Sequence, residues 1–495
     1  MKKDQTKTPY FTKLKEYSKR PVVPFDVPGH KRGTFLTDFN DELGEKIFNY
    51  DSNAPRGLDN LNHPTTVIKE AEDLAADAFG ADKAYFITGG TTIGILAMIM
   101  AACKAKQKII MPRNVHKSII NGLILSGGIP VFIKPNMDND LGIANGVSFA
   151  KYKKAIDDNL DAAAVFIINP TYFGVINDLK SIIDYAHDKD MLVISDEAHG
   201  GNLYFSDNMP LSVIEAGGDL SAVSMHKTLG SLTQSSILLS RGDRVDHQRL
   251  RATLNIVQST SPSQLLIASI DTARKAMVFG GMEKIDIVVD WAKDAIKRIN
   301  RIPGISSYSK EYFVSNGSFD YDESKIIIKV SDLGLTGFEV YKILADDYDI
   351  QMELAENKLL LGILSVGTTK DHLEKLVLAL EDISKRFYGK KEPIISRTVY
   401  AYPESYTRPR EAYHAPHKII RIEDSLGEIA SESVMVYPPG IPLVIPGEII
   451  SQEIIDTLNE YQLSNSTILS DCKDGYIKVI DKEEWIKWEG YIDEI

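Results

Sequence analysis

Hydrophobic and polar residues recur along the chain with the spacings of amphipathic helices and buried strands. In the stretch 65–80, TTVIKEAEDLAADAFG, apolar residues fall three or four positions apart, which predicts a helix that ends at Gly80. The strand-like run AYFIT, a turn with two glycines and the apolar stretch IGILAMIMAACKA follow directly. The order is therefore helix, strand, turn and helix.

The same alternation continues to about residue 240. Apolar runs predict strands, and periodic stretches between them predict helices, at 108–112, 113–127, 129–133, 148–158, 163–168 and 178–187 in turn. A further strand is predicted at 235–240 and a helix at 244–257. Such a βαβα pattern indicates an α/β fold with a mainly parallel sheet and helices on both faces.

Two apolar runs within 192–236 end in polar side chains, in LVISDEAHGG and SAVSMHKTLGSLTQSS. They predict buried strands that end at Asp196 and Ser224. Ligands bind beyond the carboxyl ends of parallel strands, so Asp196 and Lys227 are expected to face one crevice. Two simpler interpretations stay open: the aspartate caps a helix, or the Ser-x-His-Lys pattern arose by chance.

A lysine near a carboxylate and several hydroxyl groups is typical of pyridoxal phosphate (PLP) chemistry. There the lysine forms a Schiff base, the aspartate keeps the pyridinium nitrogen protonated, and hydroxyls and backbone amides hold the phosphate. The turn Gly89–Thr92, between a strand and a helix, predicts such an anion site. The alternative is an ordinary tight turn.

Further candidates lie in loops that follow predicted strands. His116 could stack on an aromatic ring or be an ordinary hydrogen-bonded histidine, and Thr171 opens another loop at the same edge. In the N-terminal segment, His30 and Lys31 are either solvated or reach a neighbouring active site.

The hydrophobic pattern changes near Pro303, where short strands and helices indicate a separate α+β domain. A polar linker then leads to a region with the proline-broken segment YPPGIPLVIPGE, too irregular for a helix or a central strand. We therefore predict four parts: an arm at 1–64, a large α/β domain at 65–301, a small α+β domain at 302–390 and a C-terminal domain at 391–495.

Composition narrows the function classes. The net charge of −13 disfavours a nucleic-acid surface. The only cysteines, Cys103 and Cys472, argue against a disulfide framework and a cysteine metal site, and we expect no metal. The N-terminus has no apolar core of a signal peptide, and no apolar run reaches membrane-spanning length. We expect a cytoplasmic protein with no membrane partner.

Taken together, these segments resemble the fold-type-I PLP-dependent ornithine/lysine/arginine decarboxylases, and most closely the short bacterial arginine decarboxylases. The resemblance covers nearly the whole chain, in the motifs FDVPGHKRG, LDNLNHP, FGADKAYF, PRNVHKSIINGLILSG, INPTYFGV, SDEAHGG, SMHKTLGSLTQSS, STSPS and VYPPGIPLVIPGE. It implies an aspartate-aminotransferase-like large domain with smaller α+β C-terminal domains, and PLP as the cofactor.

The resemblance also implies residue roles. Lys227 attaches the cofactor, Asp196 pairs with its ring nitrogen, His116 stacks on the ring and His199 lies near its face or phenolic oxygen. The other positions that match cofactor contacts are Gly90, Thr91, Thr92, Thr171, Ser224, His226 and Thr260, the last toward a partner subunit. Two positions depart from the family: Thr92 stands where serine is usual, and Asp26 where histidine is frequent.

The implied reaction is decarboxylation of arginine to agmatine and CO₂, in polyamine biosynthesis, by a homodimer or a dimer of dimers. Lysine and ornithine are the alternative substrates; an aminotransferase or lyase, and a non-catalytic protein of this fold, are the alternative functions. A long cationic side chain needs a carboxylate in its pocket. We select Glu432 in DSLGEIASES, whose alternative role is a solvated helix charge.

Overall fold

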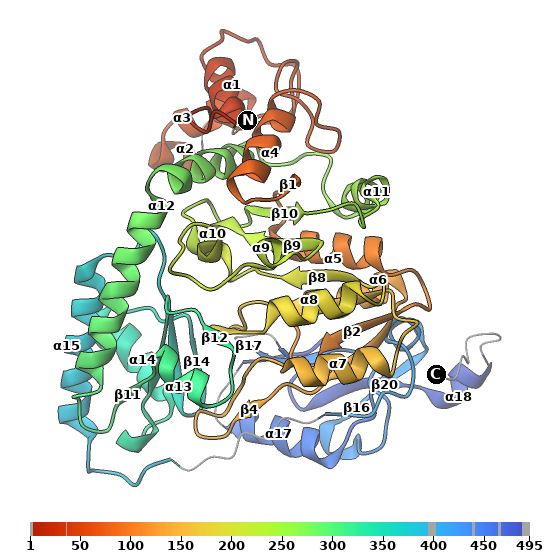
Figure 1. Cartoon of the computed structure of the whole chain (residues 1–495), viewed down its shortest axis with the longest axis vertical. Helices are drawn as coiled ribbons and strands as arrows, with labels where there is room; N and C mark the ends of the chain where they lie inside the picture. The colour runs from red at the N-terminus through yellow and green to blue at the C-terminus, as the bar shows by residue number, and fades with distance from the viewer. Residues whose placement is uncertain (1–2, 36, 395–401, 438–440, 464–466, 488–495) are drawn as a thin grey trace. The chain divides into compact units, whose positions relative to one another are not determined.

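A computed structural model of the chain describes residues 3–35, 37–394, 402–437, 441–463 and 467–487 (Figure 1). The chain divides into two compact units. The first comprises Met1–Ala101, Ile194–Ile287 and Ser365–Gly367, and the second Ala102–Val193, Val288–Leu364 and Thr368–Ile495. Each unit joins parts of several of the four predicted domains, so those boundaries stay a prediction.

The first unit is built on strands in the order β1-β10-β9-β8. Their bounds are Lys83–Ile87 (β1), Ser236–Ser240 (β10), Leu220–Ser224 (β9) and Leu192–Asp196 (β8, which begins in the second unit). β8 runs parallel to β9, whereas β10 is antiparallel to both β9 and β1. The predicted strands that end at Asp196 and Ser224 are therefore confirmed as parallel neighbours.

Helices pack on these strands through the apolar faces that the sequence predicts. Helix α4 (Val67–Ala78) buries Ile68, Ala71 and Leu74, and helix α5 (Gly90–Ala102) follows β1. Gly94 permits the close packing of α5, because a Cβ atom there would lie 2.9 Å from the Ile87 side chain. The remaining helices of this unit are α1 (Pro9–Ser18), η1 (Lys31–Gly33), α2 (Asp38–Leu43), α3 (Lys46–Tyr50), η2 (Gly201–Tyr204), α9 (Val213–Ala216), α10 (Met225–Thr228) and α11 (His247–Val257), with α12 (Gln264–Ile299) beginning here.

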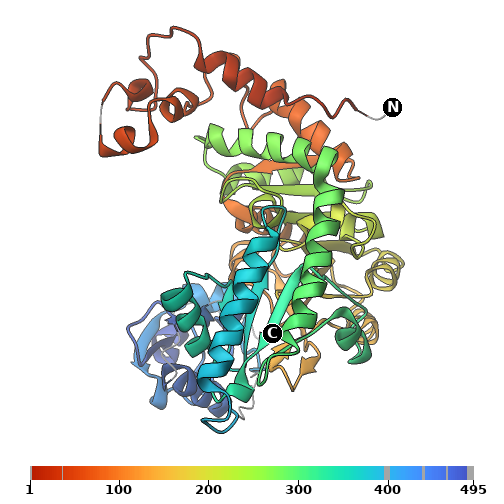
Figure 2. The same ribbon diagram turned by 90° about the vertical axis from the view of Figure 1, so that its left-hand side faces the viewer.

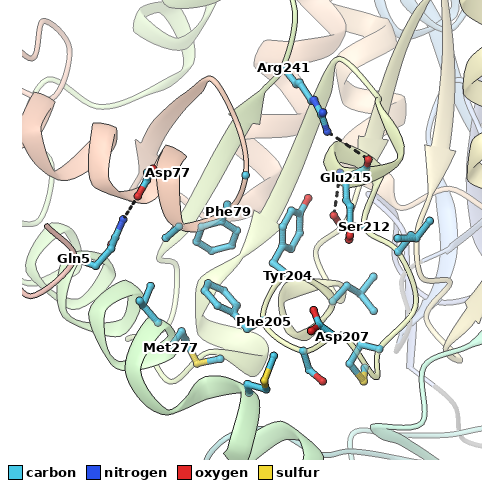
Figure 3. A pocket seen from close by; sticks show the side chains of 18 residues that line it. Gln5, Asp77, Phe79, Tyr204, Phe205, Asp207, Ser212, Glu215, Arg241 and Met277 are labelled. Atoms are coloured by element: carbon cyan, nitrogen blue, oxygen red, sulfur yellow. Dashed lines mark hydrogen bonds between the residues drawn. The ribbon is translucent and has the colours of Figure 1, made fainter. Parts of the chain in front are cut away.

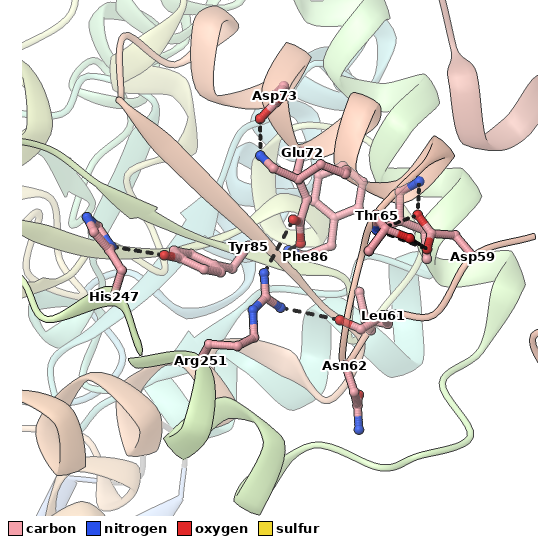
Figure 4. A network of polar contacts seen from close by, with 12 residues as sticks. Asp59, Leu61, Asn62, Thr65, Glu72, Asp73, Tyr85, Phe86, His247 and Arg251 are labelled. Carbon is pink, nitrogen blue, oxygen red and sulfur yellow. Dashed lines mark hydrogen bonds and ion pairs between the residues drawn. The ribbon is translucent and has the colours of Figure 1, made fainter. Parts of the chain in front are cut away.

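Polar contacts tie the LDNLNHP segment to helices α4 and α11 (Figure 4), where Arg251 donates to the Leu61 carbonyl at 3.3 Å. Asp59 accepts hydrogen bonds from the backbone N–H groups of Thr66 and Ile68 at 2.8 and 3.1 Å, which caps the start of α4. Arg251 lies 3.5 Å from the buried carboxylate of Glu72. Burial raises the pKa of Glu72 to about 7, although Arg251 opposes that shift.

The second unit contains three parallel strands in the order β6-β2-β3. These strands are Ala164–Ile168 (β6), Lys108–Pro112 (β2) and Ile129–Ile133 (β3). Helices α6 (Lys117–Ser126) and α7 (Phe149–Asp157) connect them along the chain, and α8 (Leu179–His187) follows β6. Short pairs complete it: β4 (Met137–Asp138) with β5 (Ile143–Ala144), and β7 (Val175–Ile176) with β12 (Asp320–Tyr321).

A separate antiparallel sheet in this unit, after the change of pattern near Pro303, has the order β11-β13-β15-β14. Its strands are Ser306–Ser307, Lys325–Lys329, Leu359–Ile363 and Leu354–Ala355 in that order. A shared apolar core joins the sheet to helices α14 and α15. The helices are α13 (Lys310–Ser315), η3 (Ser331–Leu333), α14 (Gly337–Tyr348) and α15 (Lys370–Phe387).

The C-terminal region forms two small sheets, β16-β20 and β18-β17-β19. Proline-containing β18 (Ile441–Val444) lies at an edge, as a strand that lacks a backbone N–H group must. The other elements are α16 (Pro409–His414), β16 (His417–Arg421), η4 (Ile422–Asp424), β17 (Val434–Tyr437), α17 (Gln452–Leu463), β19 (Thr467–Leu469), β20 (Tyr476–Ile480) and α18 (Lys482–Lys487).

Across the described ranges, no helix combines the length and the apolar character needed to span a bilayer. In the first unit, helix α1 of the N-terminal arm packs against α4, and Figure 2 shows the part of the arm that contains α2 and α3 extending away from the strands. Several of the arm's large apolar side chains are exposed: Val23, Phe25, Val27, Phe35, Phe39 and Leu43.

Candidate active site

An amine and an imidazole are in contact where β8 and β9 end in the first unit, and a carboxylate lies at the same sheet edge. Lys227, on the short helix α10 just after β9, places its Nζ atom 2.8 Å from Nε2 of His199. Asp196 is the last residue of β8 and is buried, and its Oδ1 atom accepts the backbone N–H of Ala198 at 2.9 Å. Parallel β8 and β9 thus bring these residues to one sheet edge, as predicted.

The neighbouring Glu197, the first residue after β8, has a different role. Its carboxylate accepts hydrogen bonds from the Val213 backbone N–H at 2.9 Å and the Ser221 hydroxyl at 2.5 Å. The Tyr204 hydroxyl donates to the same group. Glu197 therefore fixes the segment after β8, whereas Asp196 is the last residue of β8 itself.

Three buried hydroxyl groups form a second cluster in this unit. The Thr91 Oγ1 atom lies 2.5 Å from Oγ of Ser224 and 2.7 Å from Oγ of Ser236. Ser236 was not predicted for this site; the antiparallel pairing that sets it opposite Ser224 brings it there. The cluster borders the first turn of α5, where backbone N–H groups lack partners within the helix.

Glycine is required at the start of that helix. Gly90 has a φ of +77°, and its backbone N–H donates to the Gln234 carbonyl at 2.8 Å. A Cβ atom at Gly90 would meet no atom within 4 Å, so there is open space beside the turn. Thr92 is exposed on the same turn. Hydroxyls, a helix N-terminus and open space together suit a phosphate group.

His226 is half-buried between Ser224 and Lys227. Its Nδ1 atom donates to the Ser235 carbonyl at 2.9 Å, so Nε2 of the neutral ring carries no proton. Burial lowers the pKa of His226, which favours this neutral form. Neutral His226 can accept a hydrogen bond through Nε2. Nε2 must be protonated before it can donate a hydrogen bond to an anion.

Thr260 lies in the exposed connection between α11 and α12. Gln264, the first residue of α12, donates from Nε2 to the Pro262 carbonyl at 2.9 Å and accepts the hydroxyl of Tyr10 in α1. The loop is thus tied to the N-terminal arm. In that arm His30 lies 3.2 Å from the carboxylate of Asp51.

His116 and Thr171 belong to the second unit, beyond the carboxyl ends of parallel neighbours β2 and β6. The predicted helix start at residue 113 is wrong: α6 begins at Lys117, because Nδ1 of His116 caps it by accepting the Ser118 backbone N–H at 3.2 Å. Thr171 is buried, and its hydroxyl accepts the backbone N–H of Val175 at 3.0 Å.

Glu432 is buried and hydrogen-bonded inside the C-terminal region. Its side chain is 1 % exposed, and its oxygens accept the Ser470 hydroxyl at 2.8 Å and the backbone N–H groups of Asp471 and Lys478 at 2.5 and 2.6 Å. The residue lies outside any helix, so the alternative of a solvated helix charge is wrong. Its predicted contact with a substrate stays a prediction.

Arg113 and Glu448 form a buried pair that the sequence did not reveal. Arg113 Nε and Nη2 donate to the two Glu448 oxygens at 2.9 and 2.7 Å, and Nη1 donates to the Pro442 carbonyl at 2.9 Å. Burial raises the pKa of Glu448 and Arg113 opposes the shift. Arg113 lies in the PRNVH motif and Glu448 ends YPPGIPLVIPGE; only the fold connects them.

A pocket of about 770 Å³ in the first unit contains none of the predicted site residues (Figure 3). Phe79, Tyr204 and Phe205 pack together in it, with Phe79 ring centroids 5.0 and 4.8 Å from the other two. Gln5 bridges to Asp77 at its edge. The predicted site residues at the ends of β8 and β9 therefore do not line this pocket.

Two family descriptions match the chain: Orn/Lys/Arg decarboxylase, major domain, over residues 8–372, and the C-terminal domain of the same family over residues 394–468. The arginine decarboxylase of Bacillus subtilis (strain 168) is 42% identical over 455 residues, covering 91% of this chain and 93% of the relative.

Solved structures support the fold. The lysine decarboxylase of Francisella novicida has a TM-score of 0.85 at 23% identity, covering 96% of this chain and 81% of that one. The ureidoglycine-glyoxylate aminotransferase of Bacillus subtilis has a TM-score of 0.52 at 14% identity, covering 66% and 86%. Together with the mixed, mostly parallel strands, these likenesses confirm the predicted α/β, aminotransferase-like fold class.

Proposed function

Because the chain belongs to the Orn/Lys/Arg decarboxylase family, we propose that it decarboxylates L-arginine to agmatine and CO₂ with PLP as its cofactor. The observation that carries the proposal is the contact between Lys227 and His199, 2.8 Å apart beside Asp196 at the ends of β8 and β9. This edge combines an amine, a proton acceptor and a carboxylate, the groups that amino-acid chemistry on PLP requires.

The residues of the first unit fit the cofactor. Thr91, Ser224 and Ser236 offer hydroxyl groups beside the N-terminus of α5, which suits the phosphate. The Thr228 hydroxyl, next to Lys227, is buried and has no hydrogen-bond partner among the residues that the structure describes. A buried hydroxyl group without a hydrogen-bond partner destabilises the fold unless a ligand bonds to it.

When bound, PLP supplies an electron sink for the pair left on the α-carbon as CO₂ departs. Lys227 supplies the amine that attaches the cofactor, and His199 can take a proton from that amine or return one. Asp196 would keep the ring nitrogen of the bound cofactor protonated. His116 would stack on the ring, and Gly90, Thr92, Thr171, His226 and Thr260 are proposed as its further contacts.

Arginine is the proposed substrate because the relative at 42% identity is named arginine decarboxylase. Lysine is the second candidate, favoured by the likeness to a solved lysine decarboxylase. Glu432 is the proposed reader of the guanidinium, although the Ser470 hydroxyl and two backbone N–H groups already bind its oxygens. An aminotransferase would instead form a keto acid.

The direct test is CO₂ release from arginine, lysine and ornithine in parallel, with keto-acid formation measured in the same samples. The proposal expects arginine to turn over fastest, with one agmatine per CO₂. Faster release from lysine would overturn the substrate assignment, and keto acid without CO₂ would overturn the reaction. An unchanged KM for arginine in Glu432→Gln would remove Glu432 as the reader.

We also propose that the enzyme works in the cytoplasm as a homodimer or a dimer of dimers. The exposed apolar side chains of the arm support an assembly, since Phe25 is 94 % and Phe35 73 % exposed and such surfaces favour burial against a partner. Light scattering on the purified protein tests the assembly. A fully active monomer at assay concentration would contradict it, and fractionation of cells tests the location.

A further inference from the structure

We propose that Glu448, in the C-terminal region, positions His116 through Arg113. This inference rests on the proposed function, in which His116 contacts the cofactor ring. It identifies Arg113 and Glu448 as positioning residues and explains what the C-terminal region contributes to the β2–α6 loop.

The loop is short and held at both ends. Arg113 follows β2 directly, and its backbone N–H donates to the Ile133 carbonyl at 3.0 Å. His116, three residues later, caps α6 through its contact with the Ser118 N–H at 3.2 Å. Three residues span about 10 Å at most, and Val115 between them is buried. A shift of Arg113 therefore moves His116.

Among the described residues, the hydrogen-bond acceptors of the Arg113 side chain all lie in the C-terminal region. Its guanidinium binds both oxygens of Glu448 and the carbonyl of Pro442, and lies 5.4 Å above the ring of Phe132. Glu448 is itself held, because its Oε2 atom accepts the Ile445 backbone N–H at 2.9 Å. Arg113 and Glu448 are only 5 % and 1 % exposed.

A buried ion pair is weak evidence for stability, because apolar side chains of similar size often replace it without loss. Its planar, two-pronged contact instead specifies direction and distance, which a lysine or an apolar pair cannot reproduce. The geometry therefore indicates that orientation, more than stability, is what this pair supplies to the loop.

The experiment compares holoenzymes carrying Arg113→Met, Glu448→Leu and both substitutions. Three properties are measured: the melting temperature, the visible circular dichroism of the bound cofactor, and hydrogen exchange in the first turn of α6. Glu411→Gln is the matched control, because it breaks the Arg408–Glu411 pair (2.7 Å; 7 % and 11 % exposed) in the same region.

We expect each single variant to melt earlier and the double variant to regain most of that loss. The double variant should still show reduced cofactor dichroism, faster exchange at residues 117–120 and a kcat lower by about tenfold, as for a misplaced catalytic contact. Glu411→Gln should lower only the melting temperature.

Wild-type dichroism and exchange in a double variant of restored stability would overturn the proposal, since the pair would then be structural alone. If that variant does not fold, Arg113→Lys decides: normal dichroism and exchange overturn the proposal, and altered values support it. Hydrogen exchange is also measured without cofactor, so this result does not depend on the proposed function. The proposed function is tested separately by CO₂ release from the wild-type enzyme.

Discussion

Two polar contacts, one in each unit, differ in what their side chains can do. In the first unit, Lys227 lies 2.8 Å from His199, and amines and imidazoles exchange protons when their surroundings permit. In the second, Arg113 binds both oxygens of Glu448, and a guanidinium stays protonated. The first contact can move a proton, whereas the second can only hold a geometry.

The two contacts also differ in how fully they are satisfied. Arg113 and Glu448 use nearly all of their polar atoms on each other and on nearby backbone groups. At the ends of β8 and β9, by contrast, Lys227 is half-buried and the Thr228 hydroxyl lacks a partner among the described residues. Unused hydrogen-bonding capacity marks the region where a ligand belongs.

The largest expected effect comes from removing the charge of Asp196. Asp196→Asn should lower kcat by about 10²–10³-fold, because a preorganised charge beside the reacting system is lost. The amide oxygen can still accept the Ala198 N–H, so the melting temperature should change little.

Glu448→Gln provides the contrast for Asp196→Asn. Losing one partner of a fully buried pair should cost about 3–5 kcal/mol of unfolding free energy. Steady-state kinetics and denaturant unfolding on both variants test whether Asp196→Asn mainly lowers kcat and Glu448→Gln mainly lowers stability. A destabilised Asp196→Asn enzyme with normal kcat would contradict it.

A smaller effect concerns Glu72, a buried carboxylate that does change charge near neutral pH. Its pKa is about 7 when folded, against an ordinary 4.5, so its protonated form stabilises the fold at low pH. That contribution is complete below about pH 4.5 and is lost as pH rises through about 7, a change of about 3 kcal/mol.

Glu72→Gln should therefore flatten the decline of stability between about pH 5 and pH 8. Urea unfolding at both pH values, on this variant and on the exposed neighbour variant Glu70→Gln as a control, provides the measurement. An equal decline in both variants would show that Arg251 keeps Glu72 ionised throughout.

The smallest effect tests the hydroxyl cluster. Thr91→Val removes the atom that lies within 2.7 Å of both Ser224 and Ser236. One lost hydrogen bond to a charged group should weaken PLP binding about tenfold. Thr91→Ser keeps the hydroxyl and should bind nearly as wild type. Equal affinity in all three proteins, measured by PLP titration of the apoenzyme, would exclude the cluster from the phosphate site.

Local sequence predicted the elements that carry the first-unit site. The apolar runs before Asp196 and Ser224 define strands, and Lys227 follows the second strand by three residues, so its placement needs no distant contact. Ser236 escaped prediction because its position depends on antiparallel pairing of β10 with β9, which an apolar run does not reveal.

Contacts between residues far apart in the chain could not be predicted from the sequence. Arg113 and Glu448 are 335 positions apart, and neither motif indicates its partner. Likewise, Glu432 in DSLGEIASES reads as an exposed charge, yet β20 and the segment before it supply its hydrogen-bond donors. The helix start at Lys117 was missed because a histidine cap has no strong local signature.

The residue that attaches the cofactor can be identified directly. PLP-loaded protein is reduced with borohydride, digested and sequenced by mass spectrometry, with Lys227→Arg as the control. If Lys227 attaches the cofactor, one labelled peptide is expected, which contains Lys227, and no label in Lys227→Arg, where the charge is kept but the nucleophilic amine is lost. Label on Lys117 or another lysine, or label that persists in Lys227→Arg, would contradict it.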